Sequence, residues 1–503
     1  MMKTKPRSLA YFYEKFKAIL LILLIVLCIV QVGILWSSQS GSFPISLFSN
    51  SKSPSPVSIE DSKSEYLLPY RVVLSSGFNQ NHYLIANGSE DYNMLWEGAK
   101  QFIDQALRTK PKNTQIFSEN DWGTIVASNP YTFEFKTQIP VDIIKWVLNI
   151  SEPKKTIGEG IAGIYKVVIC PDDPNNNYSD ILYIRDNKNI YTYDLKDSKI
   201  NALNADVFNA IYTKQESDVN SKNYQMAIEM FKKFEISKDL LGIFGDKRQE
   251  SYADITYKPI EGLAKEEYDD KDLNNIEKEL FGNNGGVYDF DIDVNGSVVF
   301  KKSDGVYRLY KNSILEYRYR YTGNQAVTEN LNVLSAYKKA IALILEHRSQ
   351  NDIMSNVSVY LNSIEEGQGS GSYVFNFDYS ISLGENKGEL PVLLKNYQIP
   401  NSNSDEQLDN CISIEASSKN VNYFRWLSLK FKVDKSPKNY VWSFGNVYSE
   451  MSTFYPELKR EISAKDFGIY YILDNKKSYD IPVAPSFVLF TKDHIYDILM
   501  KGS

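Results

Sequence analysis

Several short patterns in this 503-residue chain contain residue types that perform chemistry in other proteins. The first is GEGIAG at residues 158–163, which has the G-x-G-x-x-G spacing of a dinucleotide-binding loop. Such a loop binds a pyrophosphate only where a helix follows it, because the helix N-terminus provides the anion site. Here the strand-like sequence IYKVVIC follows, so we expect a glycine loop that leads into a β-strand.

An acidic turn is the second candidate. Asp291, Asp293, Asn295 and Gly296 have the spacing of the first half of a calcium-binding loop, but the position that should hold a bidentate glutamate is Lys302. Apolar and polar residues alternate on both sides of the Asn-Gly pair. The sequence therefore predicts a β-hairpin with a type I′ turn, for which Asn-Gly is the favoured central pair.

A serine and a lysine form the third candidate. Ser335 and Lys338 reproduce the S-x-x-K pair of penicillin-recognising enzymes. No K-[ST]-G sequence follows, and we expect the serine to lie inside a helix over residues 327–347, not at its start. Nothing in the sequence approximates the G-x-S-x-G nucleophile motif. We therefore predict no acyl-transfer chemistry.

The histidines and carboxylates give no clearer site. His82, His347 and His494 are far apart, and none has the H-E-x-x-H spacing or a similar metal-ligand spacing. Neighbouring acids such as Glu365 and Glu366 are plentiful in this acidic chain, so no glycosidase pair can be singled out. The sequence predicts a protein with no catalytic centre, no bound metal and no cofactor.

The elements that would position any site begin with an apolar run near the N-terminus. No residue from Ala18 to Trp36 is charged, and at about 1.5 Å of rise per residue the run spans roughly 28 Å, the thickness of a bilayer core. A signal peptide normally has a shorter core and a small-residue cleavage site, whereas WSSQSGSFP is a poor site. Cys28 follows Leu27 and not the small residue expected in a lipoprotein. We predict an uncleaved transmembrane helix over residues 18–36.

The flanking charges predict the direction of this helix. Residues 1–17 contain five basic residues and one acidic residue, whereas residues 37–51 contain no charge. Segments rich in lysine and arginine stay on the cytosolic side of a membrane. We therefore expect a single-pass protein of the cell membrane, with a cytosolic N-terminus and the bulk of the chain outside the cell.

Four residues of the predicted span share one helical face, because they are spaced by four, three and four positions. They are Leu24, Cys28, Gln31 and Leu35. In lipid, a hydrogen bond between helices from an amide such as Gln31 is worth about 0.6–2 kcal/mol. We expect this face to bind a partner helix. The alternative is that Gln31 lies near enough to the outer boundary to reach headgroup water.

Charge and cysteine content exclude several classes of protein. Without residues 1–17, the chain has 51 basic and 62 acidic residues. This acidic excess argues against binding to nucleic acid and against direct adhesion to anionic lipid. Only Cys170 and Cys411 lie outside the predicted span, so the protein is no disulfide scaffold. We expect buried free thiols, although a single bridge stays possible.

The remaining sequence predicts an α+β fold of antiparallel sheets packed with helices on one face, without the βαβα order of parallel sheets. A Ser- and Pro-rich stretch before Tyr66 predicts a flexible linker. The expected parts are a cytosolic tail (1–17), the transmembrane helix (18–36), the linker (37–65), an N-terminal α+β domain (66–200), a middle α+β domain (201–350) and a C-terminal α+β domain (351–503).

Local patterns add expectations within these domains. An amphipathic helix ends near Leu107, with Ser89 or Asp91 as its N-cap. We expect strands at TIVAS, TFEFKTQI, GIYKVVIC and DILYIRDNKNIYTYDL, a charged loop at AKEEYDDKDLNNIEKE and mainly helix between residues 205 and 241.

Several stretches resemble the YycH family. They are LLPYRVVLSSG, DYNMLWEGAKQFIDQAL, WGTIVASNPYTFEFKTQIPVDIIKWVL and the pair NLNVLSAYKKAIALIL and YVFNFDYSISL. YycH proteins are auxiliary regulators of the WalK (YycG) sensor histidine kinase in low-GC Gram-positive bacteria and act together with YycI. The resemblance implies an extracytoplasmic protein of several α+β domains, without enzymatic activity, whose span packs beside the transmembrane helices of the kinase. Residues 200–285 show no such likeness.

An alternative from another class is an anchored cell-envelope enzyme or glycan-binding module with a site made of scattered residues. The 36 tyrosines make a carbohydrate-binding platform conceivable. Tyrosines at strand spacing are, however, more often part of a sheet surface or core.

Overall fold

The computed structural model describes residues 58–500, apart from residues 129, 151–159, 171–180, 196–199, 201, 218–221, 225, 227–247, 261–262, 264–266, 282–288, 303–304, 321–331, 351–353, 355, 368–370, 385–387, 400–406, 460–463 and 476–478. Residues Val57–Ser503 form one compact unit, to which everything described below belongs. The predicted tail, the predicted transmembrane helix and most of the predicted linker lie outside the described residues. The last seven linker residues, 59–65, belong to the short helices α2 (Ile59–Ser62) and η2 (Lys63–Tyr66).

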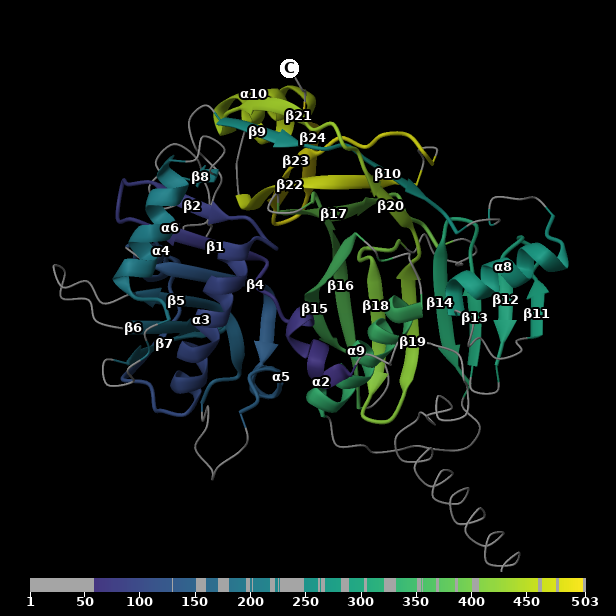
Figure 1. Ribbon diagram of the computed structural model, residues 1–503, viewed down its shortest axis with the longest axis horizontal. Helices are drawn as coiled ribbons and strands as arrows, with labels where there is room; N and C mark the ends of the chain where they lie inside the picture. The colour runs from purple at the N-terminus through teal and green to yellow at the C-terminus, as the bar shows by residue number, and fades with distance from the viewer. Residues whose placement is uncertain are drawn as a thin grey trace, which may run out of the picture. The chain divides into compact units, whose positions relative to one another are not determined.

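Eight strands form an antiparallel sheet with the order β3-β7-β6-β5-β4-β1-β2-β8 (Figure 1). The strands are β1 (Arg71–Ser75), β2 (His82–Ile85), β3 (Asn113–Ile116), β4 (Tyr131–Pro140), β5 (Gly163–Cys170), β6 (Ile181–Arg185), β7 (Asn189–Asp194) and β8 (Lys222–Tyr224). The predicted strands at TFEFKTQI, GIYKVVIC and DILYIRDNKNIYTYDL are confirmed as β4, β5 and the β6–β7 hairpin. β8 lies where the sequence predicts helix, because pairing with β2 extends this stretch.

Helices cover both faces of this sheet. They are α3 (Glu90–Leu107), α4 (Glu119–Ala127), α5 (Val141–Val147) and α6 (Ala205–Ser217). α3 begins as predicted, since the Ser89 hydroxyl accepts the Tyr92 N–H at 3.2 Å. Val72 packs in the core that contains α3 and α5, whereas Val73 packs against Trp122 of α4 on the other face. The expectation of helices on one face is therefore wrong for this sheet.

The TIVAS segment is helical and not a strand, because it forms the end of α4. Ser118 caps this helix by accepting the Asp121 N–H at 3.4 Å. Trp122 and Val126, four positions apart, are both buried. The β-branched residues of the segment misled the prediction, since tertiary burial of a helical face outweighs local strand propensity.

A second sheet contains twelve strands, in the order β11-β12-β13-β14-β19-β18-β16-β17-β22-β23-β24 with β15 paired to β16. Its strands are β11 (Asp289–Ile292), β12 (Val298–Lys301), β13 (Gly305–Leu309), β14 (Ile314–Tyr319), β15 (Val357–Glu366), β16 (Ser372–Ser382), β17 (Glu389–Lys395), β18 (Ile412–Ser417), β19 (Val421–Leu427), β22 (Ala464–Asp474), β23 (Ser486–Thr491) and β24 (Ile495–Leu499). All neighbours are antiparallel except β17 and β22, which are parallel.

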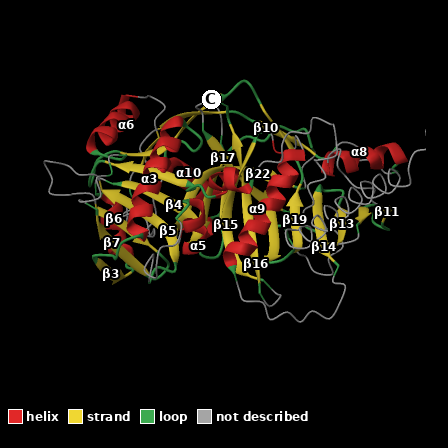
Figure 2. Ribbon diagram, turned by 60° about the horizontal axis from the view of Figure 1, so that its bottom comes forward, coloured by secondary structure: helices red, strands yellow, loops and turns green. Residues whose placement is uncertain are grey.

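Three longer helices accompany the large sheet: α8 (Asp270–Phe281), α9 (Val333–Gln350) and α10 (Phe444–Phe454). α9 crosses β16, β18 and β19 (Figure 2), and α10 packs near β24 and the short helix η6 (Pro456–Lys459). Two small sheets join β9 (Arg248–Tyr252) to β21 (Lys438–Trp442) and β10 (Ile255–Lys258) to β20 (Lys430–Val433). The chain is thus α+β with mainly antiparallel sheets.

α8 replaces most of the predicted charged loop. Its four buried residues, Leu273, Ile276, Leu280 and Phe281, recur at helical spacing. Asp270 and Asp272 stand in its first turn, where negative charge is favoured by the helix dipole. The many charges of the segment obscured this narrow apolar stripe. The predicted boundaries at residues 200 and 350 stay predictions; strands from both sides of residue 350 share the large sheet.

Candidate functional site

The predicted partner-binding face lies outside the described residues. Leu24, Cys28, Gln31 and Leu35 all precede residue 58, where the description begins. Across the residues that are described, no helix combines the length and the hydropathy needed to cross a bilayer. The transmembrane helix and its docking face therefore stay predictions.

The glycine motif leads into a strand, as expected. Gly160 has a left-handed φ of +95° and Gly163 begins β5. A Cβ on Gly163 would lie 2.5 Å from the carbonyl oxygen of Ile139, so only glycine permits this close approach to β4. The first two residues of the motif lie outside the described part of the chain.

The acidic turn is a hairpin, but its turn type differs from the prediction. Asp293 accepts the Gly296 N–H at 2.9 Å and donates its own N–H to Ser297 at 3.0 Å. Gly296 is left-handed with a φ of +75°, whereas Asn295 has no positive φ. The loop is therefore a type I turn followed by a left-handed glycine, and the type I′ expectation is wrong. The Asp293 carboxylate accepts the backbone N–H groups of Asn295 and Ser297 and so stabilises the turn.

The S-x-x-K pair lies at the beginning of α9. Asn332 caps this helix by accepting the Ser335 N–H at 2.9 Å, so Ser335 is in the first turn and not inside the helix as expected. The Lys338 ammonium lies 3.8 Å from a Glu60 carboxylate oxygen and 4.9 Å from the centre of the Trp146 ring. The lysine therefore helps to fasten α2 and α5 to α9.

The three histidines lie apart from one another. His82 is buried in β2, and His494 is exposed before β24. His347 is buried in α9 beside the rings of Phe424 and Trp426, at 5.8 and 5.1 Å between centres. Burial lowers the pKa of His347 to about 4, which keeps its ring neutral. Within the described ranges, no group of histidine, cysteine and acidic residues has the arrangement of a metal site.

Both cysteines outside the predicted span are buried free thiols, as expected. Cys170 packs in the small core between α4 and the eight-stranded sheet. Burial raises the pKa of its thiol to about 12, so the thiol stays protonated and unreactive at neutral pH.

Charged side chains meet where β1, β4 and β5 approach β22. The Arg71 guanidinium lies 2.7 Å from the Asp466 carboxylate and 3.3 Å from that of Glu134, and the Lys166 ammonium lies 2.7 Å from the second Glu134 oxygen. Burial alone would raise the pKa of Asp466, but Arg71 and Lys136 outweigh it and lower that pKa. We call these five residues the charged seam.

Lys136 completes the seam from β4. Its ammonium lies 4.6 Å from the centre of the Tyr70 ring and 5.6 Å from those of Tyr470 and Phe490. It also donates to the Tyr470 hydroxyl at 3.1 Å and lies 3.8 Å from Asp466. Burial alone would lower the pKa of Lys136. Tyr470 and Asp466 raise this pKa by more than burial lowers it, so the amine stays charged. The seam therefore joins the two sheets by compensated charges, and Lys136 offers no neutral amine as a base.

Asp378 lies near this seam on β16, opposite Tyr360 of β15. Its carboxylate accepts the Cys411 N–H at 3.3 Å. Burial raises the pKa of Asp378 to about 7, while the hydrogen bond from Cys411 and the charge of Lys136 act in the opposite direction. Asp378 thus changes its charge near neutral pH.

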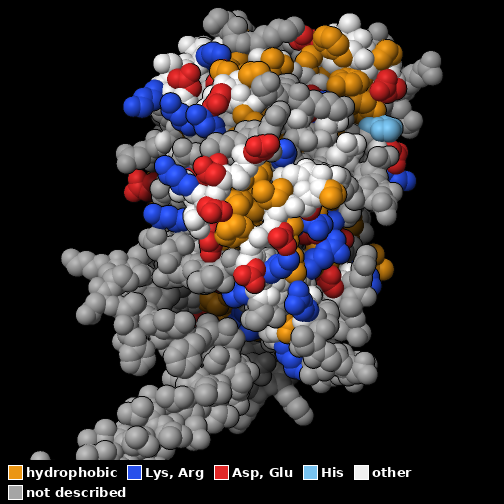
Figure 3. All heavy atoms as spheres, turned by 90° about the vertical axis from the view of Figure 1, so that its right-hand side faces the viewer, with side chains coloured by type: hydrophobic (Ala, Val, Ile, Leu, Met, Phe, Trp, Pro, Cys, Tyr) orange, Lys and Arg blue, Asp and Glu red, His pale blue; other side chains and the backbone are white. Residues whose placement is uncertain are grey.

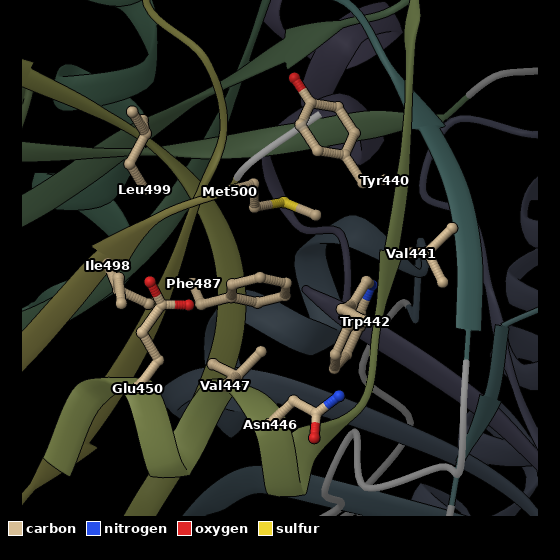
Figure 4. Close-up of a pocket in the computed structure, with 10 residues that line it drawn as sticks. All are labelled: Tyr440, Val441, Trp442, Asn446, Val447, Glu450, Phe487, Ile498, Leu499 and Met500. Carbon is tan, nitrogen blue, oxygen red and sulfur yellow. The ribbon is translucent and has the colours of Figure 1, made fainter. Parts of the chain in front are cut away.

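A hollow of about 100 Å³ lies between β21, α10 and β24 (Figure 4). Its lining is mostly apolar, and Asn446 and Glu450 of α10 add polar groups. The apolar residues that line it are Tyr440, Val441, Trp442, Val447, Phe487, Ile498, Leu499 and Met500. Ligand pockets usually measure about 300–1,000 Å³. The hollow therefore fits a single side chain better than a cofactor.

The wall of the hollow is held by aromatic packing. The Trp442 and Phe487 ring centres lie 4.6 Å apart, and the Trp442 indole donates to the Glu250 carboxylate at 3.3 Å. In Figure 4, Phe487 and Met500 point into the hollow, whereas Val441 points away from it. Val441 and Leu499 remain 45% and 55% exposed. An apolar surface thus continues outward from the hollow.

Sequence reasoning missed both the seam and the hollow. Four of the five residues of IYDIL (495–499) are apolar, and its two isoleucines and its tyrosine favour a strand, so the composition of this stretch indicates β24. Arg71 and Asp466, in contrast, give no sign of one another in the sequence, because the two residues are 395 positions apart.

The sequence model of the YycH protein, N-terminal domain, matches residues 14–211, which is less than half of the 503 residues. No protein with a curated description matches the chain.

Two solved structures have similar chains. The crystal structure of YycH from Bacillus subtilis has 10% sequence identity and a TM-score of 0.49, and the match covers 86% of this chain and 96% of that one. An uncharacterized protein from Eubacterium rectale has 10% identity and a TM-score of 0.30, with 53% and 86% of the two chains covered. Both TM-scores lie below 0.5.

Proposed function

We propose that the chain belongs to the YycH family, whose N-terminal domain model matches residues 14–211, and that it is a non-enzymatic, membrane-anchored regulator of a WalK (YycG)-type sensor histidine kinase. Membership of this family implies a regulatory protein of the YycG two-component system. The family match is the observation that carries the proposal. It begins at residue 14, so the apolar run over residues 18–36 belongs to the matched segment.

We place the regulatory contact on one face of the predicted span. Leu24, Cys28 and Leu35 supply apolar packing there, and Gln31 supplies an amide that can hydrogen-bond across helices. A lateral contact that favours one kinase state by about 1–3 kcal/mol would change the equilibrium between its states roughly 5–150-fold. A single helix contact therefore has enough energy to regulate a kinase.

The partners in this proposal are a WalK (YycG)-like sensor histidine kinase and a YycI-like protein. The chain is held at the cell membrane by its one span, with residues 1–17 in the cytosol and the remainder outside the cell. The five basic residues of the tail support this direction. The acidic excess of the remaining chain supports a role that does not involve nucleic acid.

Site-directed photo-crosslinking in native membranes tests the proposal. The probe is placed in turn at Leu24, Cys28, Gln31 and Leu35. Matched controls on the opposite face are Ile22 and Ile29. We expect adducts with a histidine kinase or a small YycI-like protein only from the first face. Adducts from both faces alike, or from neither, would rule out this docking face.

A second experiment separates the regulator from an anchored enzyme or glycan-binding module, which no observation on the described residues favours. Residues 1–36 are fused to an unrelated extracellular domain and expressed in place of the native chain. A regulator that acts through its span keeps part of its effect on kinase output. A glycan-binding module or enzyme loses all of it, and complete loss would count against the proposal.

A further inference from the structure

β24 is the last strand in the order of the large sheet, so one of its two edges faces away from β23. Met500 donates its N–H to Pro485, and the His494 carbonyl accepts the Thr491 N–H, at 3.0 and 2.9 Å. Even-numbered residues of β24 therefore direct their backbone groups toward β23, because these directions alternate along an antiparallel strand. The residues that direct them outward are Ile495, Asp497 and Leu499.

The outer edge carries apolar side chains. Ile495 and Leu499 are 53% and 55% exposed, and Asp497 between them pairs with Lys395 at 2.9 Å. The Asp497 carbonyl accepts the hydroxyl of Tyr455, the C-cap of α10, at 3.1 Å, so this side chain already contacts the middle of the edge. Phe454, which precedes that tyrosine, is 66% exposed. Figure 3 shows hydrophobic side chains at the top, the end where Figure 1 has the C-terminal elements, and also in the middle of the face that it draws.

Charge distinguishes one end of the strand. Burial raises the pKa of Tyr496, and the neighbouring carboxylates Glu457 and Asp493 raise it further. Lys492 lies in the same turn as Asp493, so the two acids outnumber it and leave this end negative. A segment that binds here is favoured by a basic residue near Ile495.

We propose that an extended, mainly apolar segment of a partner protein adds to the outer edge of β24 and places one aliphatic side chain in the hollow between β21, α10 and β24. In strand addition, main-chain hydrogen bonds give affinity and side-chain pockets give specificity. The volume of about 100 Å³ suits one leucine or methionine side chain. This contact lies outside the predicted span and does not depend on the proposed contact with the kinase.

The test uses the purified full chain in lipid nanodiscs and four fluorescein-labelled peptides of nine residues. The first peptide alternates threonine and valine, with a central leucine and a terminal lysine. The other three carry alanine at the centre, glutamate at the terminus, or N-methyl groups on the backbone. We expect the first to bind and the alanine peptide to bind roughly tenfold to a hundredfold more weakly. The N-methylated peptide should not bind.

Two matched proline variants locate the site. Leu499→Pro removes an outward N–H of β24 without breaking its ladder with β23. Ile116→Pro makes the same change on β3, another edge strand, where Ile116 is 82% exposed and the neighbouring Phe117 N–H points to β7. Binding should be lost only in Leu499→Pro.

Three results would overturn the proposal: no binding of the leucine peptide to the unmodified chain, equal binding of the leucine and alanine peptides, or equal binding by the two proline variants. Sedimentation of the unmodified chain without peptide checks a different occupant. If the chain self-associates and only Leu499→Pro abolishes this, the outer edge of β24 binds a second copy of the chain. That result would also overturn the proposal. None of these readouts involves a kinase, so failure here leaves the proposed function untouched.

Discussion

Arg71 on β1 and Asp466 on β22 are 395 positions apart in sequence, yet their guanidinium and carboxylate lie 2.7 Å from each other. The arginine and aspartate side chains are only 8% and 16% exposed. The same guanidinium also contacts Glu134, so one cation joins two acids from different sheets. Such a pair is costly to break, because removal of one partner leaves the other charge buried.

Replacing Asp466 with asparagine should therefore destabilise the protein by about 3 kcal/mol. The matched control is Asp291→Asn, which removes the partner of Lys301 on the exposed β11–β12 hairpin, where the side chains are 64% and 47% exposed. The control should change the free energy of unfolding by less than about 1 kcal/mol. Urea unfolding of both variants measures the difference. Equal effects would mean that the seam contributes no more than a surface pair.

Asp378 should make the protein less stable as pH rises from about 4 to about 7. Its pKa in the folded chain is raised to about 7, so in this range the folded state holds a proton that the unfolded state has lost. The loss of stability is at most about 4 kcal/mol and is complete above the folded pKa. Asp378→Asn should remove this slope, as measured by urea unfolding at several pH values. An unchanged slope in the variant would show that the carboxyl is ionised throughout.

His347 should have the opposite effect. Its folded pKa is lowered to about 4, so as pH falls from about 6.5 the unfolded state takes up a proton that the folded state refuses. The contribution of the neutral His347 ring to the free energy of unfolding is therefore fully present above pH 6.5. It decreases by up to about 3 kcal/mol as the pH falls toward 4. His347→Phe keeps a ring beside Phe424 and Trp426 and should abolish this decrease. NMR titration of the ring checks the pKa directly; a value near 6.5 would contradict the prediction.

Two glycines should respond to alanine with opposite signs. A Cβ on Gly305 would lie 2.3 Å from a ring carbon of Tyr317 and 2.8 Å from the Arg318 carbonyl oxygen, so Gly305→Ala should cost roughly 1–3 kcal/mol. Gly445 lies in α10 with no neighbour within 4 Å of such a Cβ, and Gly445→Ala should stabilise by about 0.5–1 kcal/mol. Thermal unfolding of both variants tests this. A stable Gly305→Ala variant would mean that the Tyr317 ring moves aside freely.

Much of the local structure was readable from the sequence. The spacing of Leu95, Ala99 and Phe102 indicated α3, and Ser89 is the one of its two predicted caps that begins the helix. Alternation around Asn295-Gly296 indicated the hairpin, although the left-handed residue is the glycine alone, which changes the turn type. The helix and the hairpin depend on residues that are close in sequence, so the local sequence pattern is enough to predict them.

The failures have a common physical cause. TIVAS has strand propensity but is helical because Trp122 and Val126 are buried together, and α8 hides a narrow apolar stripe among charges. In both segments, burial against distant parts of the chain outweighs local propensity. Sequence patterns also carried no sign of the parallel β17–β22 pair, which depends on strand order.

The sequence by itself determined the α+β class, the hairpins and the resemblance to the YycH family, because periodicity, turn residues and family patterns are properties of short stretches. It also supplies the predicted span with Leu24, Cys28, Gln31 and Leu35, since an apolar run is read from composition alone. Only the tertiary structure decided that Arg71 meets Asp466 and that β21, α10 and β24 enclose a hollow. The first contact joins residues 395 positions apart, and the hollow is lined by residues of separate helices and strands. Packing, and not a local sequence pattern, brings these residues together.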